Sequence, residues 1–270
     1  MRDRERYLDL DGARLRVRES GAGPAVVLVH GWALDAQMWE PQIADLARDY
    51  HLITYDRRGF GLSSGEPGID ADIADLRSLL DVLDIQRACF LGMSQGARVV
   101  LHFAQRHRKL ASCLVLDGPP AIADVDTHAS SEIPMDRYRD ILRRFGLEAF
   151  RREWQQHALM QLQTQDPTMR AILRTIIERY PGKDLLSTQA KVSPRIEWRS
   201  LDIPMFVING EQDTDSRLAA ATCIVELSAD ACHAIVPDAG HLPNLDNPTY
   251  YNAALRSFLH QHAATERAST

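Results

Sequence analysis

The sequence predicts an α/β fold in which eight strands form a mostly parallel sheet and one helical segment is inserted. Three observations carry this prediction. Strand-like and helix-like patterns alternate over most of the chain, several strand patterns are apolar throughout, and residues 119–200 contain helical patterns but no strand. Alternation of this kind is typical of parallel βαβ units with helices on both faces of the sheet. A chain of 270 residues suits one large domain with an insertion better than two independent domains.

The first two predicted strands form a hairpin. Residues 14–18 alternate charged and apolar side chains, so we expect a half-exposed strand that pairs antiparallel with residues 7–10. Residues 25–29 are apolar throughout, as in strands that a parallel sheet buries on both faces. The remaining strands are expected, in chain order, at residues 52–55, 88–92, 113–116, 204–208 and 233–236.

Helical patterns lie between these strands. The last helix has the clearest start, because Asn247 can cap its N-terminus and Pro248 suits its first turn. The helices of the sheet layers are expected at residues 37–48, 69–83, 95–105, 216–227 and 248–259.

The strand-free stretch divides the chain into two parts. Residues 119–200, with helical patterns at 135–145 and 147–163, are expected to form a helical cap over one end of the sheet. Residues 1–118 and 201–270 would then form the α/β core.

Composition excludes several classes of protein. Lys and Arg number 31 against 37 Asp and Glu, and this net charge of −6 argues against nucleic acid as the main partner. No apolar run reaches the ~18–20 residues that span a membrane, and the N-terminus shows no apolar signal segment. The four cysteines have no paired spacing. We therefore expect a cytoplasmic protein with reduced cysteines and no membrane partner.

The strongest chemical signal is the pentapeptide Gly92-Met93-Ser94-Gln95-Gly96, which follows a strand pattern and opens a helix pattern. A nucleophile on such a tight turn needs small neighbours two residues away on either side. The turn would lift the Ser94 hydroxyl clear of the sheet. We therefore predict that Ser94 is a catalytic nucleophile.

A serine is a weak nucleophile unless a base removes its proton. His241 is the best candidate base, because it lies in a loop beside Gly240 after the last strand pattern, where sites of α/β sheets form. The base needs a carboxylate to orient it. Asp213 follows another strand pattern, 28 residues before His241, and is our preferred acid. Asp215, Glu211 and Asp117 remain alternatives.

The negative oxygen of the reaction intermediate needs two N–H donors. The backbone N–H of Gln95, directly after Ser94, is one candidate. The backbone N–H of Trp32, in the loop after the strand at 25–29, is the other. We expect Trp32, Met93, Trp154 and Leu242 to form walls of the substrate pocket.

Five segments together resemble the α/β-hydrolase superfamily. They read VVLVHGW, YDRRGFGLSS, GMSQG, INGEQD and DAGHLPNLDNP. Their order and spacing extend the resemblance over essentially the whole chain apart from the expected cap. Within the superfamily the chain is similar to two groups of small cytoplasmic carboxylesterases, the pimeloyl-carrier-protein methyl ester esterases and the 3-oxoadipate enol-lactonases. The resemblance implies an α/β-hydrolase fold and a Ser94, Asp213, His241 triad that works without a cofactor or metal.

The expected cap carries six arginines and four acidic residues between positions 136 and 153. A solvated helical face with internal ion pairs is the simpler interpretation. The esterase resemblance suggests a second one, a docking surface for an acidic acyl-carrier protein.

The sequence therefore predicts a serine hydrolase that cleaves a small or medium carboxylic ester or lactone through an acyl-enzyme. One alternative is a hydrolase of a carbon–carbon bond in a vinylogous diketone produced by ring fission, acting with the same triad. Another is a receptor of the same fold that binds a ligand without turnover and reports it through the cap.

Overall fold

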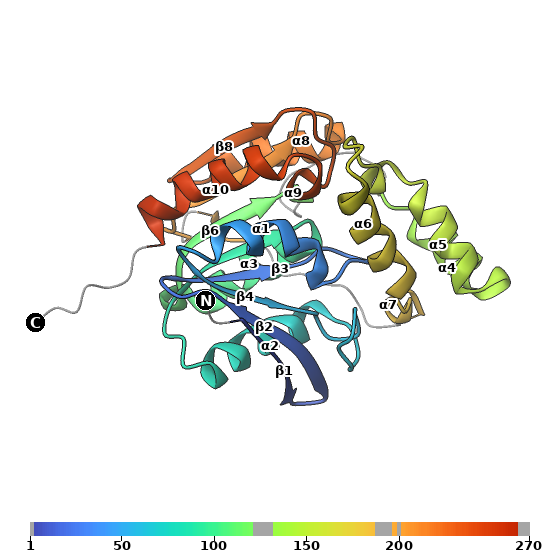
Figure 1. Ribbon diagram of the computed structural model, residues 1–270, viewed down its shortest axis with the longest axis horizontal. Helices are drawn as coiled ribbons and strands as arrows, with labels where there is room; N and C mark the ends of the chain where they lie inside the picture. The colour runs from blue at the N-terminus through green and yellow to red at the C-terminus, as the bar shows by residue number, and fades with distance from the viewer. Residues whose placement is uncertain (1–2, 121–131, 187–195, 199–200, 264–270) are drawn as a thin grey trace, which may run out of the picture.

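The computed structural model describes residues 3–120, 132–186, 196–198 and 201–263. Its eight strands form one sheet with the order β1-β2-β4-β3-β5-β6-β7-β8 (Figure 1). β2 runs antiparallel to β1 and β4, and the five other pairings are parallel. The predicted hairpin and parallel sheet are thus confirmed. The strands are β1 (Asp3–Leu10), β2 (Ala13–Ser20), β3 (Ala25–Val29), β4 (His51–Tyr55), β5 (Ala88–Met93), β6 (Ala111–Asp117), β7 (Met205–Gly210) and β8 (Ala231–Val236).

Each face of the sheet packs against its own apolar core. Side chains alternate along a strand, so Val26 and Leu28 of β3 join one core while Val27 and Val29 join the other. Helices from both halves of the chain close these cores. α1 (Glu40–Leu46) and α10 (Pro248–His262) cover the first face, and α2 (Ile69–Val82), α3 (Gln95–Arg106) and α8 (Asp215–Leu227) cover the second.

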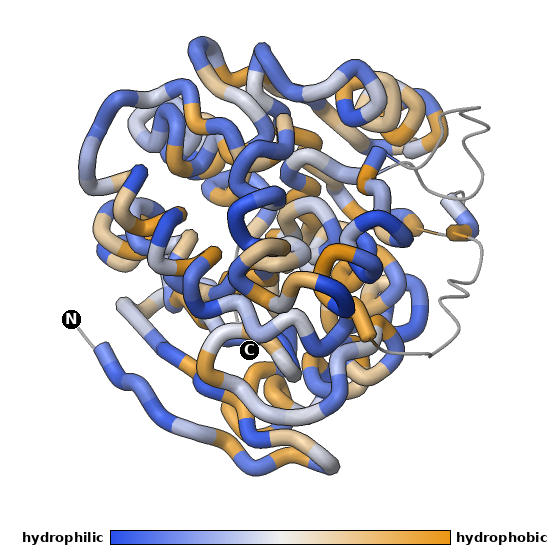
Figure 2. The backbone as a smooth tube through the Cα atoms, turned by 90° about the vertical axis from the view of Figure 1, so that its right-hand side faces the viewer, coloured by the Kyte–Doolittle hydropathy of each residue, from blue (hydrophilic) through white to orange (hydrophobic). Residues whose placement is uncertain are grey.

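In the described part of the chain between β6 and β7, four helices stand at one end of the sheet, on the right of Figure 1. We call them the cap helices: α4 (Met135–Phe145), α5 (Leu147–Gln155), α6 (Pro167–Arg179) and α7 (Lys183–Leu186). Figure 2 looks at the molecule from this end and shows hydrophilic and hydrophobic residues mixed along the chain. Such mixing is expected where each helix has one polar and one apolar face. The predicted cap boundary at residue 200 lies outside the described residues.

Two predicted helices are shorter than expected. The helix at 37–48 is divided into a 3₁₀ turn, η1 (Ala36–Trp39), and α1. Pro41 lies in the first turn of α1 and has no N–H with which to continue a helix through that point.

The helix predicted at 147–163 ends at Gln155. His157 has extended backbone angles, and its ring nitrogen accepts the N–H of Leu159 at 3.2 Å. The ring therefore caps a separate 3₁₀ turn, η3 (Ala158–Met160). Four further elements were not predicted from the sequence: α6, α7, the short α9 (Pro243–Asp246) and the 3₁₀ turn η2 (Arg108–Leu110).

The start of α10 agrees with its predicted cap. The Asn247 side chain accepts the N–H of Tyr250 at 3.2 Å, and Pro248 occupies the first turn. Among the described residues, every helix is too short or too polar to cross a lipid bilayer.

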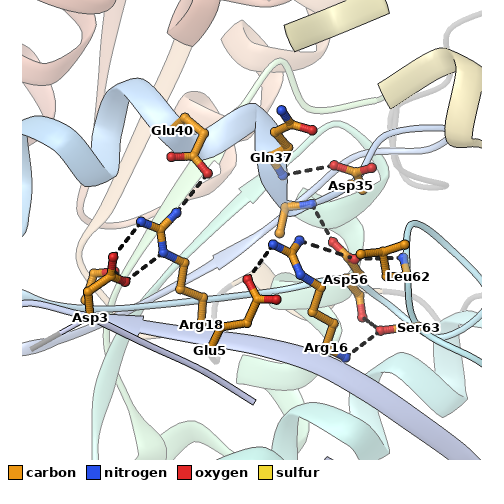
Figure 3. Close-up of polar contacts among 12 residues, drawn as sticks. Asp3, Glu5, Arg16, Arg18, Asp35, Gln37, Glu40, Asp56, Leu62 and Ser63 are labelled. Carbon is orange, nitrogen blue, oxygen red and sulfur yellow. Dashed lines mark hydrogen bonds and ion pairs between the residues drawn. The ribbon is translucent and has the colours of Figure 1, made fainter. Parts of the chain in front are cut away.

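Buried polar contacts hold together the loops that follow β3 and β4 (Figure 3). Asp56 accepts the backbone N–H of Ala36 at 2.9 Å with one oxygen and that of Leu62 at 2.8 Å with the other. Arg16 lies 3.7 Å from the same carboxylate. The loop after β3 also carries Trp32, one of the predicted pocket residues.

Candidate active site

Ser94 lies on the turn between β5 and α3, with φ 52° and ψ −112°. This positive φ is strained for a residue with a side chain, and the turn is held by a 2.7 Å bond from the Ser94 N–H to the Asp117 carbonyl. The glycines of the motif have a steric cause. A Cβ on Gly92 would lie 2.3 Å from the Gly96 oxygen, and a Cβ on Gly96 would lie 2.3 Å from the Val29 oxygen.

His241 and Asp213 meet at the same end of the sheet. Nδ1 of His241 lies 3.0 Å and 3.2 Å from the two carboxylate oxygens of Asp213. The Asn209 side chain also donates to Asp213 at 2.9 Å, and so does the N–H of Thr214. Three donors thus fix the carboxylate in one orientation.

These contacts set the charge of Asp213 and the tautomer of His241. Burial raises the pKa of Asp213, but the charge and hydrogen bond of His241, together with the other donors, hold that pKa below its usual value. An ionised carboxylate only accepts hydrogen bonds. Nδ1 of His241 is therefore the donor, and Nε2 of the neutral ring keeps a lone pair for a proton.

The other carboxylates considered from the sequence lie elsewhere. Asp215 and Glu211 are exposed. Asp117 is buried at the end of β6, where it accepts the hydroxyl of Tyr251 at 3.0 Å. Burial raises the pKa of Asp117 far above its usual value, and the charge of Asp213 adds to this effect. Of the candidates, Asp213 is the one that contacts His241.

A small, mostly apolar cavity of about 10 Å³ borders Ser94 and His241, which is room for about one water molecule. The predicted wall residues Trp32, Met93 and Trp154 line it, whereas Leu242 does not. The Leu242 side chain is fully buried at the start of α9, where it packs in the apolar core of the first sheet face instead. The remaining lining residues are Leu34, Ile133, Leu159 and Met160. The sequence did not identify the first two, and for Leu159 and Met160 it favoured packing within the cap over a place in the pocket.

Trp32 connects the cavity to the cap helices. Its indole N–H donates to Asp184 of α7, which also accepts the Tyr180 hydroxyl. Its ring packs edge-to-face on Trp154, with the centroids 4.7 Å apart. Trp32 is therefore fixed by the cap as well as by the loop after β3.

His30 precedes Gly31 and Trp32 in the loop after β3, and its ring connects this loop to the loop after β4. Its buried ring accepts the Arg57 N–H at Nε2 over 2.9 Å, so the proton is on Nδ1, which donates to the Gly31 carbonyl over 2.8 Å. Burial and the charge of Arg57 hold the pKa of His30 well below its usual value. The ring is neutral and structural.

Sequence reasoning missed Arg217, a buried residue in the first turn of α8. Its Nη1 donates to Ser94 Oγ at 3.1 Å and to the Gly118 carbonyl at 3.0 Å. Its Nε donates to the carboxylate of Glu132 at 2.7 Å. The one sequence signal was its position four residues after Asp213, on the first turn of a helix that begins beside the site.

Comparisons with known proteins show the family to which the chain belongs. The sequence profile of the alpha/beta hydrolase family matches residues 26–254. A curated relative from Metapseudomonas resinovorans, 2-hydroxy-6-oxo-6-(2'-aminophenyl)hexa-2,4-dienoic acid hydrolase, is 25% identical over 98% of this chain and 94% of its own.

Two solved structures are similar over nearly the whole chain. An esterase from Rhodococcus sp. ECU1013 is 26% identical with a TM-score of 0.74, covering 97% of this chain and all of its own. The enol-lactonase from Burkholderia xenovorans LB400 has a TM-score of 0.79 over 94% of this chain and all of its own. At 24% identity the second likeness concerns the fold alone.

Proposed function

The chain belongs to the alpha/beta hydrolase family, and from that premise we propose that it hydrolyses a carboxylic ester or lactone through an acyl-enzyme on Ser94. The observation that carries the proposal is the bond between His241 Nδ1 and Asp213, 3.0 Å long, on the cavity that Ser94 also borders. A base oriented by a carboxylate beside a strained serine is the arrangement that acyl transfer requires.

In the proposed reaction Ser94 Oγ attacks the carbonyl carbon while His241 Nε2 takes the hydroxyl proton. The imidazolium then gives that proton to the leaving alcohol oxygen. Water next attacks the acyl-enzyme, with His241 again as base, and releases the acid. Asp213 holds the imidazole and stabilises its charged form.

The negative oxygen of each intermediate would be bound by the backbone N–H groups of Gln95 and Trp32. Gln95 is the first residue of α3, so its N–H has no acceptor within the helix and is free to bind an anion. Loss of one such donor typically slows hydrolysis about 10²–10³-fold.

The cavity indicates the kind of substrate. Its lining is apolar apart from the candidate catalytic residues, and its volume is about 10 Å³. A small uncharged acyl group fits such a site with the least displacement of the wall. The residues Ile133, Trp154, Leu159 and Met160 are the part of that wall that lies outside the α/β core.

Hydrolysis of p-nitrophenyl esters from acetate to decanoate tests the proposal. We expect turnover with an optimum at the short esters for the wild type, and loss of turnover in Ser94→Ala. Ser63→Ala is a matched control, because Ser63 bonds to Asp56 and the Arg16 N–H away from the cavity. Equal hydrolysis by purified Ser94→Ala would refute the mechanism.

One observation favours a second candidate function, hydrolysis of a carbon–carbon bond. The relative from Metapseudomonas resinovorans, which matches 98% of this chain, is named as a hydrolase of a hydroxy-oxo-dienoic acid. A ring-fission product of that class absorbs visible light, so its cleavage can be followed directly. Turnover of this compound together with inactivity on every ester would favour the second function.

The cap arginines favour a solvated surface over a docking site for a carrier protein. Arg137 pairs with Glu153 and Arg151 pairs with Glu148, and both acids lie on α5. Arg139 and Arg144 pair in the same way with Asp136 and Asp140. Four of the six arginines are thus paired with acids of the same two helices, so we propose a free small molecule as the substrate.

A further inference from the structure

We propose that Arg217 is a fourth catalytic residue, which stabilises negative charge on Ser94 Oγ when the acyl-enzyme is hydrolysed, and that Glu132 positions it. The inference rests on the proposed function, because it assigns a role within the same acyl-enzyme reaction. It concerns a side chain that none of the sequence motifs contains.

The contact is with the reacting atom itself. Nη1 of Arg217 lies 3.1 Å from Ser94 Oγ, within the range of an N–H···O hydrogen bond. A hydroxyl has one proton to donate and two lone pairs to accept with. Ser94 can therefore give its proton to His241 and accept from Arg217 at the same time, so the two roles are compatible.

The guanidinium is fixed in this position on two further sides. Nη1 also donates to the Gly118 carbonyl at 3.0 Å, and Nε donates to Glu132 at 2.7 Å. Arg217 is 3% exposed and Ser94 is 7% exposed. A charge held without water in a buried site acts more strongly on its neighbours than it would in solvent.

Glu132 holds Arg217 from the side of the cap. Its carboxylate accepts Arg217 Nε and the Ser216 hydroxyl at 2.9 Å, and it also accepts the Thr214 hydroxyl. Burial raises the pKa of Glu132, but the charge of Arg217 and these hydrogen bonds outweigh it and leave the pKa below its usual value. Glu132 is therefore ionised at neutral pH and balances the buried cation.

The second half of the reaction needs this cation most. In the acyl-enzyme, Ser94 Oγ is the ester oxygen, and donation from Arg217 withdraws electron density and makes the carbonyl easier for water to attack. When the C–Oγ bond breaks, its electron pair goes to Oγ, which then takes a proton from the His241 imidazolium. Arg217 stabilises the negative charge that Oγ carries before that proton arrives.

The first half of the reaction depends on Arg217 less. Donation from Arg217 lowers the basicity of Oγ, which slows attack, but it also eases loss of the hydroxyl proton to His241. These effects oppose each other. A purely structural arginine would instead change both halves of the reaction together, by disturbing the turn that carries Ser94.

Pre-steady-state hydrolysis of p-nitrophenyl acetate separates the two halves, since the burst of p-nitrophenol reports acylation and the steady rate reports deacylation. We expect Arg217→Gln to deacylate at least about tenfold more slowly, the size expected for a charged hydrogen bond. Acylation should change less than threefold, so the burst approaches one p-nitrophenol per site. Arg217→Lys, which keeps the cation, should recover part of the loss. Glu132→Gln should also slow deacylation and lower kcat, while kcat/KM, which reports acylation, stays nearly unchanged.

Two further variants keep the test decisive. Arg137→Gln removes a cap arginine that pairs with Glu153 at the surface, and it should match the wild type in both phases. If Arg217→Gln alone does not fold, because it leaves Glu132 unpaired, the double variant Arg217→Gln/Glu132→Gln removes both charges and carries the same comparison.

Wild-type deacylation in folded Arg217→Gln or in the double variant would overturn the inference, and so would an equal loss in both phases that Arg217→Lys does not recover. Failure of the proposed function looks different. In that case the wild type gives no burst, or Ser94→Ala hydrolyses the ester as fast as the wild type does.

Discussion

The two sides of the candidate site are built by different means. On the core side, backbone geometry and directed hydrogen bonds hold Ser94, His241 and Asp213 at the ends of strands. On the side of the cap helices, the wall consists of packed apolar residues such as Trp154 and Met160. Bonds of the first kind fix atoms to within a few tenths of an ångström, whereas apolar packing tolerates changes of shape.

This difference separates chemistry from selectivity. Substitutions on the core side should change the rate of the chemical steps and leave the preferred ester length unchanged. Substitutions on the cap side should change the preferred ester length and leave the rate of the chemical steps unchanged. Trp32 and Arg217 connect the sides. Trp32 lines the cavity and donates to Asp184 of α7, and Arg217 donates both to Ser94 and to Glu132, which lies between β6 and α4.

The largest expected effect is on the core side. Asp213→Asn keeps the shape of the side chain but offers His241 a neutral partner that can hold the wrong tautomer, so we expect kcat to fall about 10⁴-fold. Asp215→Asn is the matched control, since Asp215 is exposed two residues away, and it should stay within about twofold of the wild type. Steady-state kinetics on p-nitrophenyl acetate measures both, and equal losses would break the assignment of Asp213.

The next effect is on the cap side. Met160→Ala enlarges the cavity that Met160 lines, so the optimum of the ester series should move to longer chains. Loss of this buried side chain should also lower the free energy of unfolding by about 2–5 kcal/mol. Phe145→Ala, at a residue 70% exposed on α4, should change neither quantity. An unchanged optimum in Met160→Ala would place the acyl group elsewhere.

The sequence predicted the core side far better than the cap side, for a physical reason. Ser94 and its glycines form one short motif, and Asp213 and His241 each follow a strand, so local patterns locate them. Leu159 and Met160 line the cavity from the separate turn η3, which follows the end of α5 at Gln155 and is capped by the His157 ring. Local helical periodicity does not reveal it.

Contacts between residues far apart in the sequence could not be predicted either. Trp32 donates to a carboxylate 152 positions later in the chain, and Arg217 pairs with Glu132, 85 positions earlier. Nothing in the neighbouring residues indicates either partner. The mostly parallel sheet was predictable because apolar strands alternate with helices, whereas the packing of the cap helices on Trp32 was not.

A third prediction concerns Trp32, one of the two residues that connect the core side to the cap side. Trp32→Phe keeps an aromatic ring but removes the N–H that donates to buried Asp184, so the free energy of unfolding should fall by about 1–3 kcal/mol. Trp39→Phe is a matched control, because the buried Trp39 N–H has no hydrogen-bond partner in the described part of the chain. Urea unfolding compares the two variants, and equal losses would mean that the bond to Asp184 adds nothing.

The smallest expected effect on stability concerns another contact between the core side and the cap helices. Asp35 of the loop after β3 lies 3.5 Å from Arg179 of α6. Burial and the charge of Asp56 raise the pKa of Asp35 to about 6. Between about pH 4 and pH 6 the folded state therefore binds more protons than the unfolded state, and its stability falls as the pH rises.

Asp35→Asn removes this cost and keeps an oxygen for the Gln37 N–H. We expect the variant to be more stable than the wild type by the order of 1–2 kcal/mol at pH 8, with the difference shrinking toward pH 4. Thermal unfolding across this range measures it. A variant that is less stable at pH 8 would mean that the ion pair with Arg179 outweighs the cost of burying the charge.

The central claim is that Ser94 is an activated nucleophile, and covalent labelling tests it most directly. The protein would be treated with a fluorophosphonate, and the adduct would be located by peptide mass spectrometry in the wild type, Asp213→Asn and Asp215→Asn. We predict one adduct per chain, on Ser94, formed as fast in Asp215→Asn as in the wild type and far more slowly in Asp213→Asn. A wild type that is not labelled, or is labelled at another serine, would contradict the account.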